Sequence, residues 1–401
     1  KDTPQAAETT DQSTGDKIHA AELAFARKRR SFGMVCGPIC AILVYLMPIA
    51  GLSLEAHKLL AITTLIAMWW ITEPIPIPVT SLLGPTLAVV TGVVKASVAY
   101  AAFANPMIFL FMGGFMLAKA MMMHGLDKRF AFGLLSMSWV GSNPTRIFLA
   151  IGIAAALCSG WVSNTATAAM MFPIALGLLE AIKEMFAANG RIIDLKTYKY
   201  ATGLMLVTAY SCSIGGVLTP IGTPPNLIML GFLDTMCNIH VSFFEWMIWG
   251  GAAMVIYFVL MFVILHWHFK ADVDHIEGAD VFIANKLKEL GGWTRAQKNT
   301  AFAFMVAVVL WVLPGFMSVA LGATSPILKM YNTIFPEAVV AMVAALLLFF
   351  LPVDFKKRQF TLSWKDAVEG IEWGTLILFG GGLAMGGMMF KTGLSQWIGD
   401  A

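Results

Sequence analysis

The feature that most constrains the fold is a long uncharged stretch with a polar triplet near its centre. From Ile147 to Leu179 the chain carries no Asp, Glu, Lys or Arg, and Ser163-Asn164-Thr165 lies within it. As one straight helix this stretch would be about 50 Å long, whereas the hydrocarbon core of a bilayer is about 30 Å thick. The helix is therefore expected to break, and the break falls on side chains that can bind ions.

The composition is typical of an all-α polytopic membrane protein. Hydrophobic residues make up 58% of the chain and charged residues only 13%. The basic residues cluster between apolar runs, so the net charge of +3 does not indicate nucleic acid binding. The sequence contains no His-Glu-x-x-His, no serine-nucleophile elbow and no Walker lysine, so we expect neither an enzyme nor an ATP-driven pump.

The distribution of Lys and Arg predicts the orientation in the cell membrane. Placing the Lys/Arg-rich loops on the cytoplasmic side puts the N-terminus inside, with residues 1–16 as a polar, disordered tail. On this threading the run 146–181 enters from the cytoplasm, turns at the polar triplet and returns as a re-entrant hairpin. The basic loops that fix this orientation are 27–30, 128–146, 183–199, 270–298 and 356–365.

A repeated pattern predicts an inverted-repeat transporter. Leu110-Phe111, Gly113-Gly114, Met121 and Gly125-Leu126 recur 268 residues later as Leu378-Phe379, Gly381-Gly382, Met389 and Gly393-Leu394. In the threading an odd number of crossings separates the copies, so they point in opposite directions, as in many secondary transporters. The second copy has no counterpart of the hairpin before Ala401, so we expect an excerpt in which the second repeat is truncated.

A second break is predicted at Gly222-Thr223-Pro224-Pro225-Asn226. The two prolines lack N–H groups and fit only the first turn of a helix, with Thr223 as N-cap. The alternative is a proline kink that serves packing alone. That alternative does not explain the flanking Gly222, Thr223 and Asn226.

The two breaks together offer groups for a cation and for an anion. Free carbonyls and hydroxyls suit a hard cation such as Na⁺, whereas the N–H groups that open a helix suit an anion. The alternative for the first break is that Ser, Asn and Thr only cap a kink. Without Lys or Arg at either break, a bound dianion would need compensation by co-bound cations, which favours sodium coupling. Glu73, in a proline-rich turn, is interpreted as a structural carboxylate rather than a proton carrier.

These motifs closely resemble those of the divalent anion/sodium symporter family, which contains dicarboxylate and citrate carriers. The resemblance covers residues from about 31 to the C-terminal end. It rests on the segments Ile71-Thr72-Glu73-Pro74, Val162-Ser163-Asn164-Thr165-Ala166-Thr167-Ala168, Ser213-Ile214-Gly215-Gly216 and Gly222-Thr223-Pro224-Pro225-Asn226.

The resemblance implies site residues, a homodimer and an elevator mechanism. The implied sodium ligands are Ser159, Ser163, Asn164 and the backbone of Gly222. The implied contacts to a substrate carboxylate are Asn164, Thr165, Thr223 and Pro224. Many family members have Ser where this chain has Thr223, and the added methyl group is expected to narrow the pocket.

The predicted organisation separates fixed scaffold helices from a moving transport part. Its segments are a polar cytoplasmic tail (1–30), scaffold helices of the first repeat (31–138), transport-domain elements (144–269), a cytoplasmic linker with an interfacial helix (270–298) and scaffold helices that open the second repeat (299–401). The leading hypothesis is sodium-coupled import of C4-dicarboxylates such as succinate, malate or fumarate. A sodium-independent exchanger, a citrate or sulfate carrier, a passive anion channel and a non-transporting membrane scaffold remain as alternatives.

Overall fold

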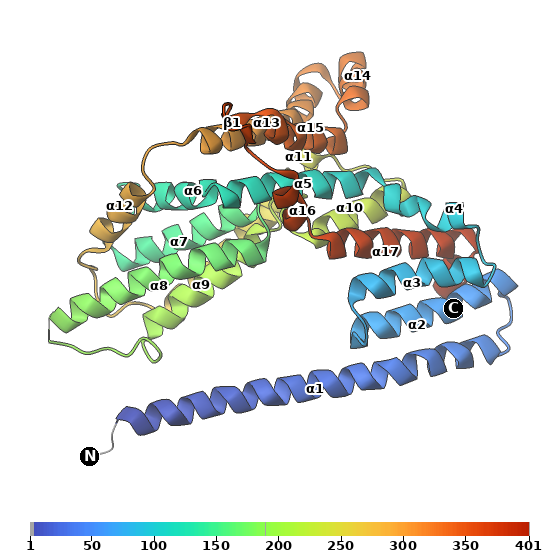
Figure 1. Cartoon of the computed structure of the whole chain (residues 1–401), viewed down its shortest axis with the longest axis horizontal. Helices are drawn as coiled ribbons and strands as arrows, with labels where there is room; N and C mark the ends of the chain where they lie inside the picture. The colour runs from blue at the N-terminus through green and yellow to red at the C-terminus, as the bar shows by residue number, and fades with distance from the viewer. Residues whose placement is uncertain (1–3, 189, 401) are drawn as a thin grey trace. The chain divides into compact units, whose positions relative to one another are not determined.

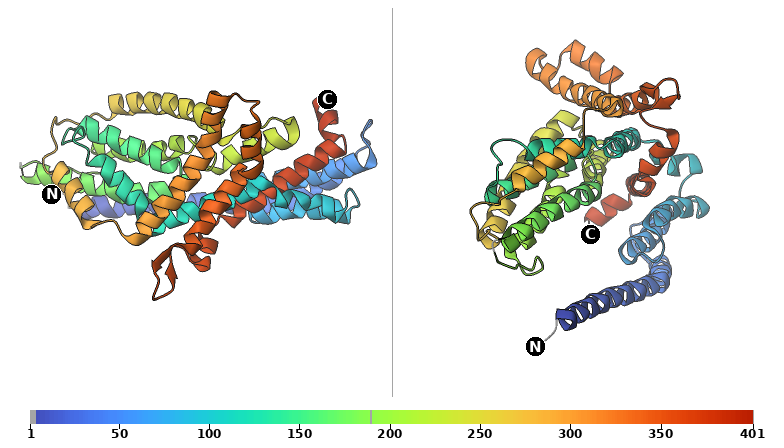
Figure 2. Two further views of the ribbon diagram at one scale, coloured as in Figure 1. Left: turned by 90° about the horizontal axis from the view of Figure 1, so that it is seen from above. Right: turned by 60° about the vertical axis from the view of Figure 1, so that its left-hand side comes forward.

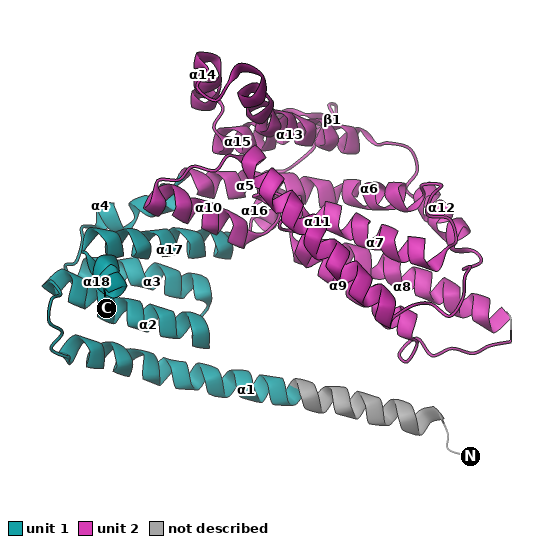
Figure 3. Cartoon of the chain, turned by 180° about the vertical axis from the view of Figure 1, so that it is seen from behind, with its two compact units in different colours: residues 1–105, 373–401 teal, residues 106–372 magenta. Residues whose placement is uncertain are grey.

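The structure is a computed structural model that describes residues 4–188 and 190–400, with side chains described from residue 20 onward. The chain forms two compact units, residues 1–105 with 373–401 and residues 106–372 (Figure 3). Apart from one short hairpin of strands, the described elements are helices. The prediction of an all-α protein is confirmed. The side chains of residues 4–19, in the predicted polar tail, lie outside the described ones.

The first unit is built from helices that pack pairwise. Helix α2 contacts α1, α3 and α18, and α3 packs along α17. Close approach of α3 and α17 requires a glycine, because a Cβ on Gly381 of α17 would lie 2.4 Å from the backbone oxygen of Ser81 in α3. The elements are α1 (Pro4–Leu46), α2 (Leu54–Thr72), α3 (Ile77–Val90), α4 (Ala96–Ala99), the 3₁₀ helix η1 (Ala101–Ala104), α17 (Trp373–Lys391) and α18 (Leu394–Asp400).

The Glu73 turn lies in this unit. Glu73 ends α2 in the left-handed conformation (φ 51°), and its carboxylate accepts a hydrogen bond from Arg29 at 2.8 Å. This geometry is that of a turn held by an ion pair, in agreement with a structural role.

The second unit contains both predicted helix breaks. Its elements are α5 (Pro106–Met123), α6 (Leu126–Leu135), α7 (Pro144–Ser159), α8 (Asn164–Ala188), α9 (Lys199–Gly215), α10 (Pro224–Cys237), α11 (Phe243–His268), α12 (Ala279–Glu289), α13 (Arg295–Leu321), α14 (Pro326–Ile334), α15 (Glu337–Phe350), β1 (Pro352–Asp354), β2 (Gln359–Phe360) and α16 (Trp364–Gly370). Helix α8 runs back alongside α7 to form a helical hairpin, and α9 packs against both (Figure 1). These three helices stay together in the two further views (Figure 2).

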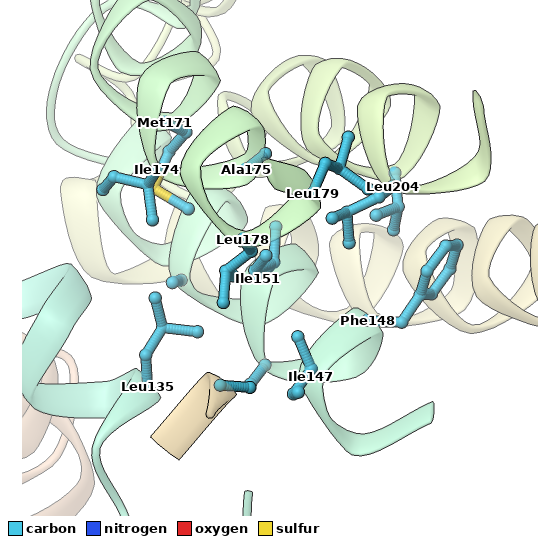
Figure 4. Close-up of a cluster of buried hydrophobic side chains, with 14 of the residues drawn as sticks. Leu135, Ile147, Phe148, Ile151, Met171, Ile174, Ala175, Leu178, Leu179 and Leu204 are labelled. Carbon is cyan, nitrogen blue, oxygen red and sulfur yellow. The ribbon is translucent and has the colours of Figure 1, made fainter. Parts of the chain in front are cut away.

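A large apolar core fixes the hairpin. Ile147 and Ile151 of α7 and Leu178 of α8 belong to one cluster of buried side chains, in which Phe148 lies toward Leu204 of α9 (Figure 4). Because lipid tails are as apolar as these side chains, helices within a membrane are held together by close van der Waals packing rather than by removal from water. The packing therefore holds the two helices as one unit that ends at the polar break.

The helices are long and apolar enough for a multi-pass membrane protein. Among the described residues, seven helices qualify by length and composition as candidate membrane spans, or eight if α14 and α15 form one bent span. The boundaries also follow the sequence repeat, because α6 begins at Leu126 and α18 at Leu394, which is 268 residues later. Gly125 and Gly393, just before these starts, both have positive φ (66° and 78°). The inverted orientation of the two copies stays a prediction.

The division into scaffold and transport segments concerns movement, and it also stays a prediction. Within the predicted linker 270–298 the chain forms α12. Asp272, at the start of that linker, accepts hydrogen bonds from Tyr198 (2.7 Å) and Arg191. This connects the linker to the segment that precedes α9.

Candidate functional site

The two helix breaks fall where the sequence predicts them. Helix α7 ends at Ser159, and α8 begins at Asn164, inside the polar triplet. Helix α9 ends at Gly215, and α10 begins at Pro224 with Thr223 as N-cap. The prolines occupy the first turn, where no intrahelical N–H donor is needed.

Glycines bring the two breaks into contact. A Cβ on Gly215 would lie 2.1 Å from the carbonyl oxygen of Ala156, so only glycine lets α9 approach α7 this closely. A Cβ on Gly216 would lie 2.4 Å from Asn164 Oδ1. A Cβ on Gly222 would lie 2.6 Å from the Gly216 oxygen and 3.0 Å from the Gly160 oxygen. The backbone of the second break is thus packed directly on the first.

A buried hydroxyl connects the two sides of this contact. The Oγ of Ser159 lies 2.7 Å from Asn164 Oδ1 and 2.6 Å from the carbonyl oxygen of Cys212. A serine hydroxyl has one hydrogen, so it donates to only one of these oxygens at a time. At least one of the two oxygens therefore accepts no hydrogen bond from the Ser159 hydroxyl. Ser159 itself is fully buried.

Thr219 adds a second connection between the breaks, and Asn226 holds the turn of the second break. Thr219 donates from Oγ1 to the carbonyl oxygen of Gly160. Asn226 donates from Nδ2 to the carbonyl oxygens of Gly216 (2.7 Å) and Thr219 (2.8 Å). Both side chains are buried. Neither was predicted as a site residue, although both are polar residues inside a long apolar run, which is the signal that identifies such positions.

The structure brings together three of the four predicted sodium ligands. Ser159 and Asn164 are hydrogen-bonded, and Gly222 lies against Gly216, which in turn lies against Asn164. The hydroxyl of Ser163 accepts from the N–H of Ala166 at 3.4 Å, as an N-terminal cap of α8. That position leaves a second lone pair on Ser163 Oγ for another partner.

The predicted carboxylate contacts lie at the two helix N-termini. Thr165 is exposed on the first turn of α8. Thr223 and Pro224 open α10 and are half-buried, and the Thr223 side chain makes no capping hydrogen bond. The positive ends of α8 and α10 therefore open at breaks that touch each other through Gly216 and Asn164.

Two buried hydroxyls nearby have uncommitted oxygens. Among the described residues, Thr167 Oγ1 and Ser211 Oγ are buried without a hydrogen-bond partner. Thr167 follows Asn164 by one turn of α8, and Ser211 precedes Gly215 by one turn of α9. They add two neutral oxygen acceptors to the helices that frame the breaks.

The site is built without formal charge. Residues 147–179 and 200–233, which contain both breaks, include no Asp, Glu, Lys or Arg. Its field must therefore come from carbonyl, hydroxyl and amide dipoles and from helix termini. Such breaks within apolar helices bind ions and substrates in secondary transporters.

The fold and the two breaks define a class, that of polytopic membrane transporters. Within this class the chain belongs to the sodium:sulfate symporter family, whose transmembrane-region model matches residues 31–401. The family assignment predicted from the sequence motifs is thereby confirmed, and the family is one of transporters, not enzymes.

Similar proteins carry a more specific name. The sodium-dependent dicarboxylate transporter SdcS of Staphylococcus saprophyticus is 34% identical over 370 residues, covering 92% of this chain and 69% of its own length. SdcS of Staphylococcus aureus is 32% identical over 399 residues, covering 97% of this chain and 74% of its own length.

Proposed function

We propose that the protein is a secondary transporter that couples the import of C4-dicarboxylates, such as succinate, malate or fumarate, to Na⁺. The observation that carries the proposal is the pair of contacting helix breaks, which present neutral oxygens and two helix N-termini without a charged side chain. The similar SdcS proteins are named sodium-dependent dicarboxylate transporters, which supports both Na⁺ as the coupling ion and a dicarboxylate as the substrate.

The absence of charge is the physical reason for the coupling. A dianion cannot enter a low-dielectric site without compensation, because the cost of burying an unpaired charge is many kcal/mol. Na⁺ ions held by Ser159, Asn164, Ser163 and the backbone at Gly222 would supply the missing positive charge. Thr165, Thr223, Pro224 and Asn164 would then meet a carboxylate at the N-termini of α8 and α10. Na⁺ is in this scheme a coupling ion and not a resident cofactor.

The decisive experiment is uptake of labelled succinate into proteoliposomes that contain the protein. We expect accumulation when an inward Na⁺ gradient is imposed and none with an equal K⁺ gradient. Succinate uptake that is indifferent to Na⁺ would refute the coupling and favour an exchanger. Competition by citrate or sulfate but not by malate or fumarate would refute the substrate class. Currents that do not saturate with substrate would indicate a channel. Normal uptake by Asn164→Ala and Thr165→Ala variants would show that the breaks take no part in transport.

The proposal includes an orientation with the N-terminus in the cytoplasm. Cys237 gives a natural test, because it is exposed and ends α10, within the stretch 232–244 that has no Lys or Arg and therefore faces outward in this orientation. A membrane-impermeant maleimide should label Cys237 in intact cells, and a Cys237→Ser variant should lose the label. Labelling of Cys237 only after permeabilisation would reverse the orientation.

The homodimer and the elevator movement are also proposals, carried by the family resemblance. Cross-linking of the purified protein in nanodiscs should give a dimer band. A strictly monomeric protein with full transport activity would refute the dimer.

A further inference from the structure

A second candidate binding site lies next to the tip of the α7–α8 hairpin, where residues of α6 and α13 line it together with the tip. A cavity of about 550 Å³ opens there, within the range of roughly 300–1,000 Å³ that ligand pockets occupy. Cys158, Trp161 and Val162 of the hairpin form one wall, and Phe304 and Met305 of α13 form another. Trp161 packs edge-on against Phe304, with ring centroids 5.0 Å apart. The residues of the sodium and substrate site are not among those that line this cavity.

The lining of the cavity suits a hydrocarbon chain. Apolar side chains dominate it, and three of them, Phe130, Met137 and Met305, are at least 50% exposed on the surface of the molecule. In a membrane protein such exposed apolar side chains face lipid. The cavity is therefore continuous with the region in which acyl chains are available.

One side of the cavity is cationic. Arg129, on α6, donates from Nη2 to the carbonyl oxygens of the loop 290–292 at 2.9–3.2 Å, and its guanidinium lies 5.1 Å from the ring centroid of Trp293. Within the described part of the chain no carboxylate pairs with Arg129, and its buried Nε has no partner. Asp127 also lines the cavity, but it is only 5% exposed and its Oδ1 accepts from the Lys128 N–H at 2.8 Å.

The polar end and the apolar end of the cavity match the head group and the acyl chain of a lipid. Trp is enriched at the membrane–water interface and Arg in the loops beside it, whereas the hairpin tip lies within the uncharged stretch 147–179. A head group at Arg129 would thus sit at the interface, and a chain that reaches Val162 would point toward the membrane interior.

We propose that this cavity binds one acyl chain of an anionic phospholipid from the surrounding membrane, with the lipid phosphate at Arg129 and the chain against Trp161 and Val162. The volume suits a single chain. The proposal depends on membrane insertion only and is independent of which substrate or ion the protein transports.

Gly133 offers a way to obstruct the cavity without damage to the fold. Gly133 lines it from α6, and a Cβ added there meets nothing within 4 Å. Gly133→Leu should therefore place a side chain where the acyl chain would lie, with a residue that also favours the helix. Gly387→Leu is the matched control, because Gly387 is also helical with open space around its Cβ but lies on α17, which contributes no residue to the lining of the cavity.

The test is photo-cross-linking of the whole protein in vesicles with phosphatidylglycerol that carries a diazirine in its acyl chain. We expect label on the α13 peptide that contains Phe304 and Met305, loss of that label in Gly133→Leu and retention in Gly387→Leu. Equal labelling in Gly133→Leu and wild type would overturn the site. Thermal unfolding of both variants checks that they are folded.

The head group and the source of the chain are tested with matched probes. Diazirine phosphatidylcholine should label the α13 peptide less than phosphatidylglycerol does, and Arg129→Gln should abolish that difference. Equal labelling by both lipids in the wild-type protein would overturn the role of Arg129. Labelling by a diazirine fatty acid without labelling by phosphatidylglycerol would overturn the phospholipid as occupant.

Discussion

Gly222 provides the sharpest test of the candidate site. In Gly222→Ala the added Cβ would lie 2.6 Å from the Gly216 oxygen and 3.0 Å from the Gly160 oxygen, and both are backbone atoms. The Gly216 carbonyl must retreat by about 0.4 Å to reach even a tight contact, whereas ligand distances at metal sites hold within about 0.2 Å. Overpacking of this kind costs about 1–3 kcal/mol.

If that cost falls on the sodium-bound state, the Na⁺ concentration for half-maximal uptake should rise about 5- to 150-fold, since 1.4 kcal/mol corresponds to a factor of ten. The assay is succinate uptake into proteoliposomes as a function of external Na⁺. Gly251→Ala is the matched control, because its Cβ would make only an ordinary contact of 3.6 Å with a Leu218 methyl. An unchanged Na⁺ dependence in folded Gly222→Ala would refute a cation site at these carbonyls.

Three further changes test other parts of the structure. Thr219→Val nearly conserves the side-chain volume but removes the hydroxyl that donates to the first break. The Na⁺ concentration for half-maximal uptake should therefore rise, and an unchanged value would exclude this contact from the site. Glu73→Gln should leave the pH profile of uptake unchanged, because we assign this carboxylate to a structural, partly buried ion pair with Arg29; a lost acid limb would show proton carriage. Partial burial alone would raise the pKa of Asp272, but the hydrogen bonds from Tyr198 and Arg191 outweigh it and lower that pKa below 3.8. Asp272 therefore stabilises the fold above its unfolded pKa, and this contribution is lost as pH falls through the lower folded pKa. An Asp272→Asn variant should melt earlier than wild type at pH 7, and the difference should shrink as pH falls through that lower pKa.

The positions of both breaks follow from the sequence for simple reasons. An uncharged run too long for the bilayer must bend, and α8 does begin at Asn164. Proline cannot lie inside a helix without loss of a hydrogen bond, and α10 does begin at Pro224. Such local rules require no knowledge of neighbours, which is why a single sequence suffices for them.

The contact between the breaks could not be predicted in this way. Gly215 against Ala156 and Thr219 against Gly160 join residues that lie some 60 positions apart, and no periodicity specifies which carbonyl a given side chain meets. Asn226 illustrates the limit, because its residue type indicates a buried amide but not that it would bond Gly216 and Thr219. The apolar cavity beside Trp161 depends on α13, more than 130 residues away, and has no motif.

The hydrogen bonds between the breaks bear on how the site can move. Ser159 bonds Cys212 of α9 and Thr219 bonds Gly160 of the first break, whereas Asn226 holds the turn of its own break; all three side chains are buried. A buried donor that loses its partner costs about 1–3 kcal/mol, and separation of the breaks would break the bonds of both Ser159 and Thr219. The hairpin α7–α8 and the broken pair α9–α10 should therefore move as one rigid body. In a Gly160→Cys/Thr219→Cys double variant that folds, formation of the disulfide should then leave succinate uptake at the level of the same variant in the reduced state. Uptake that is abolished by oxidation and returns on reduction would show that the breaks must separate during transport.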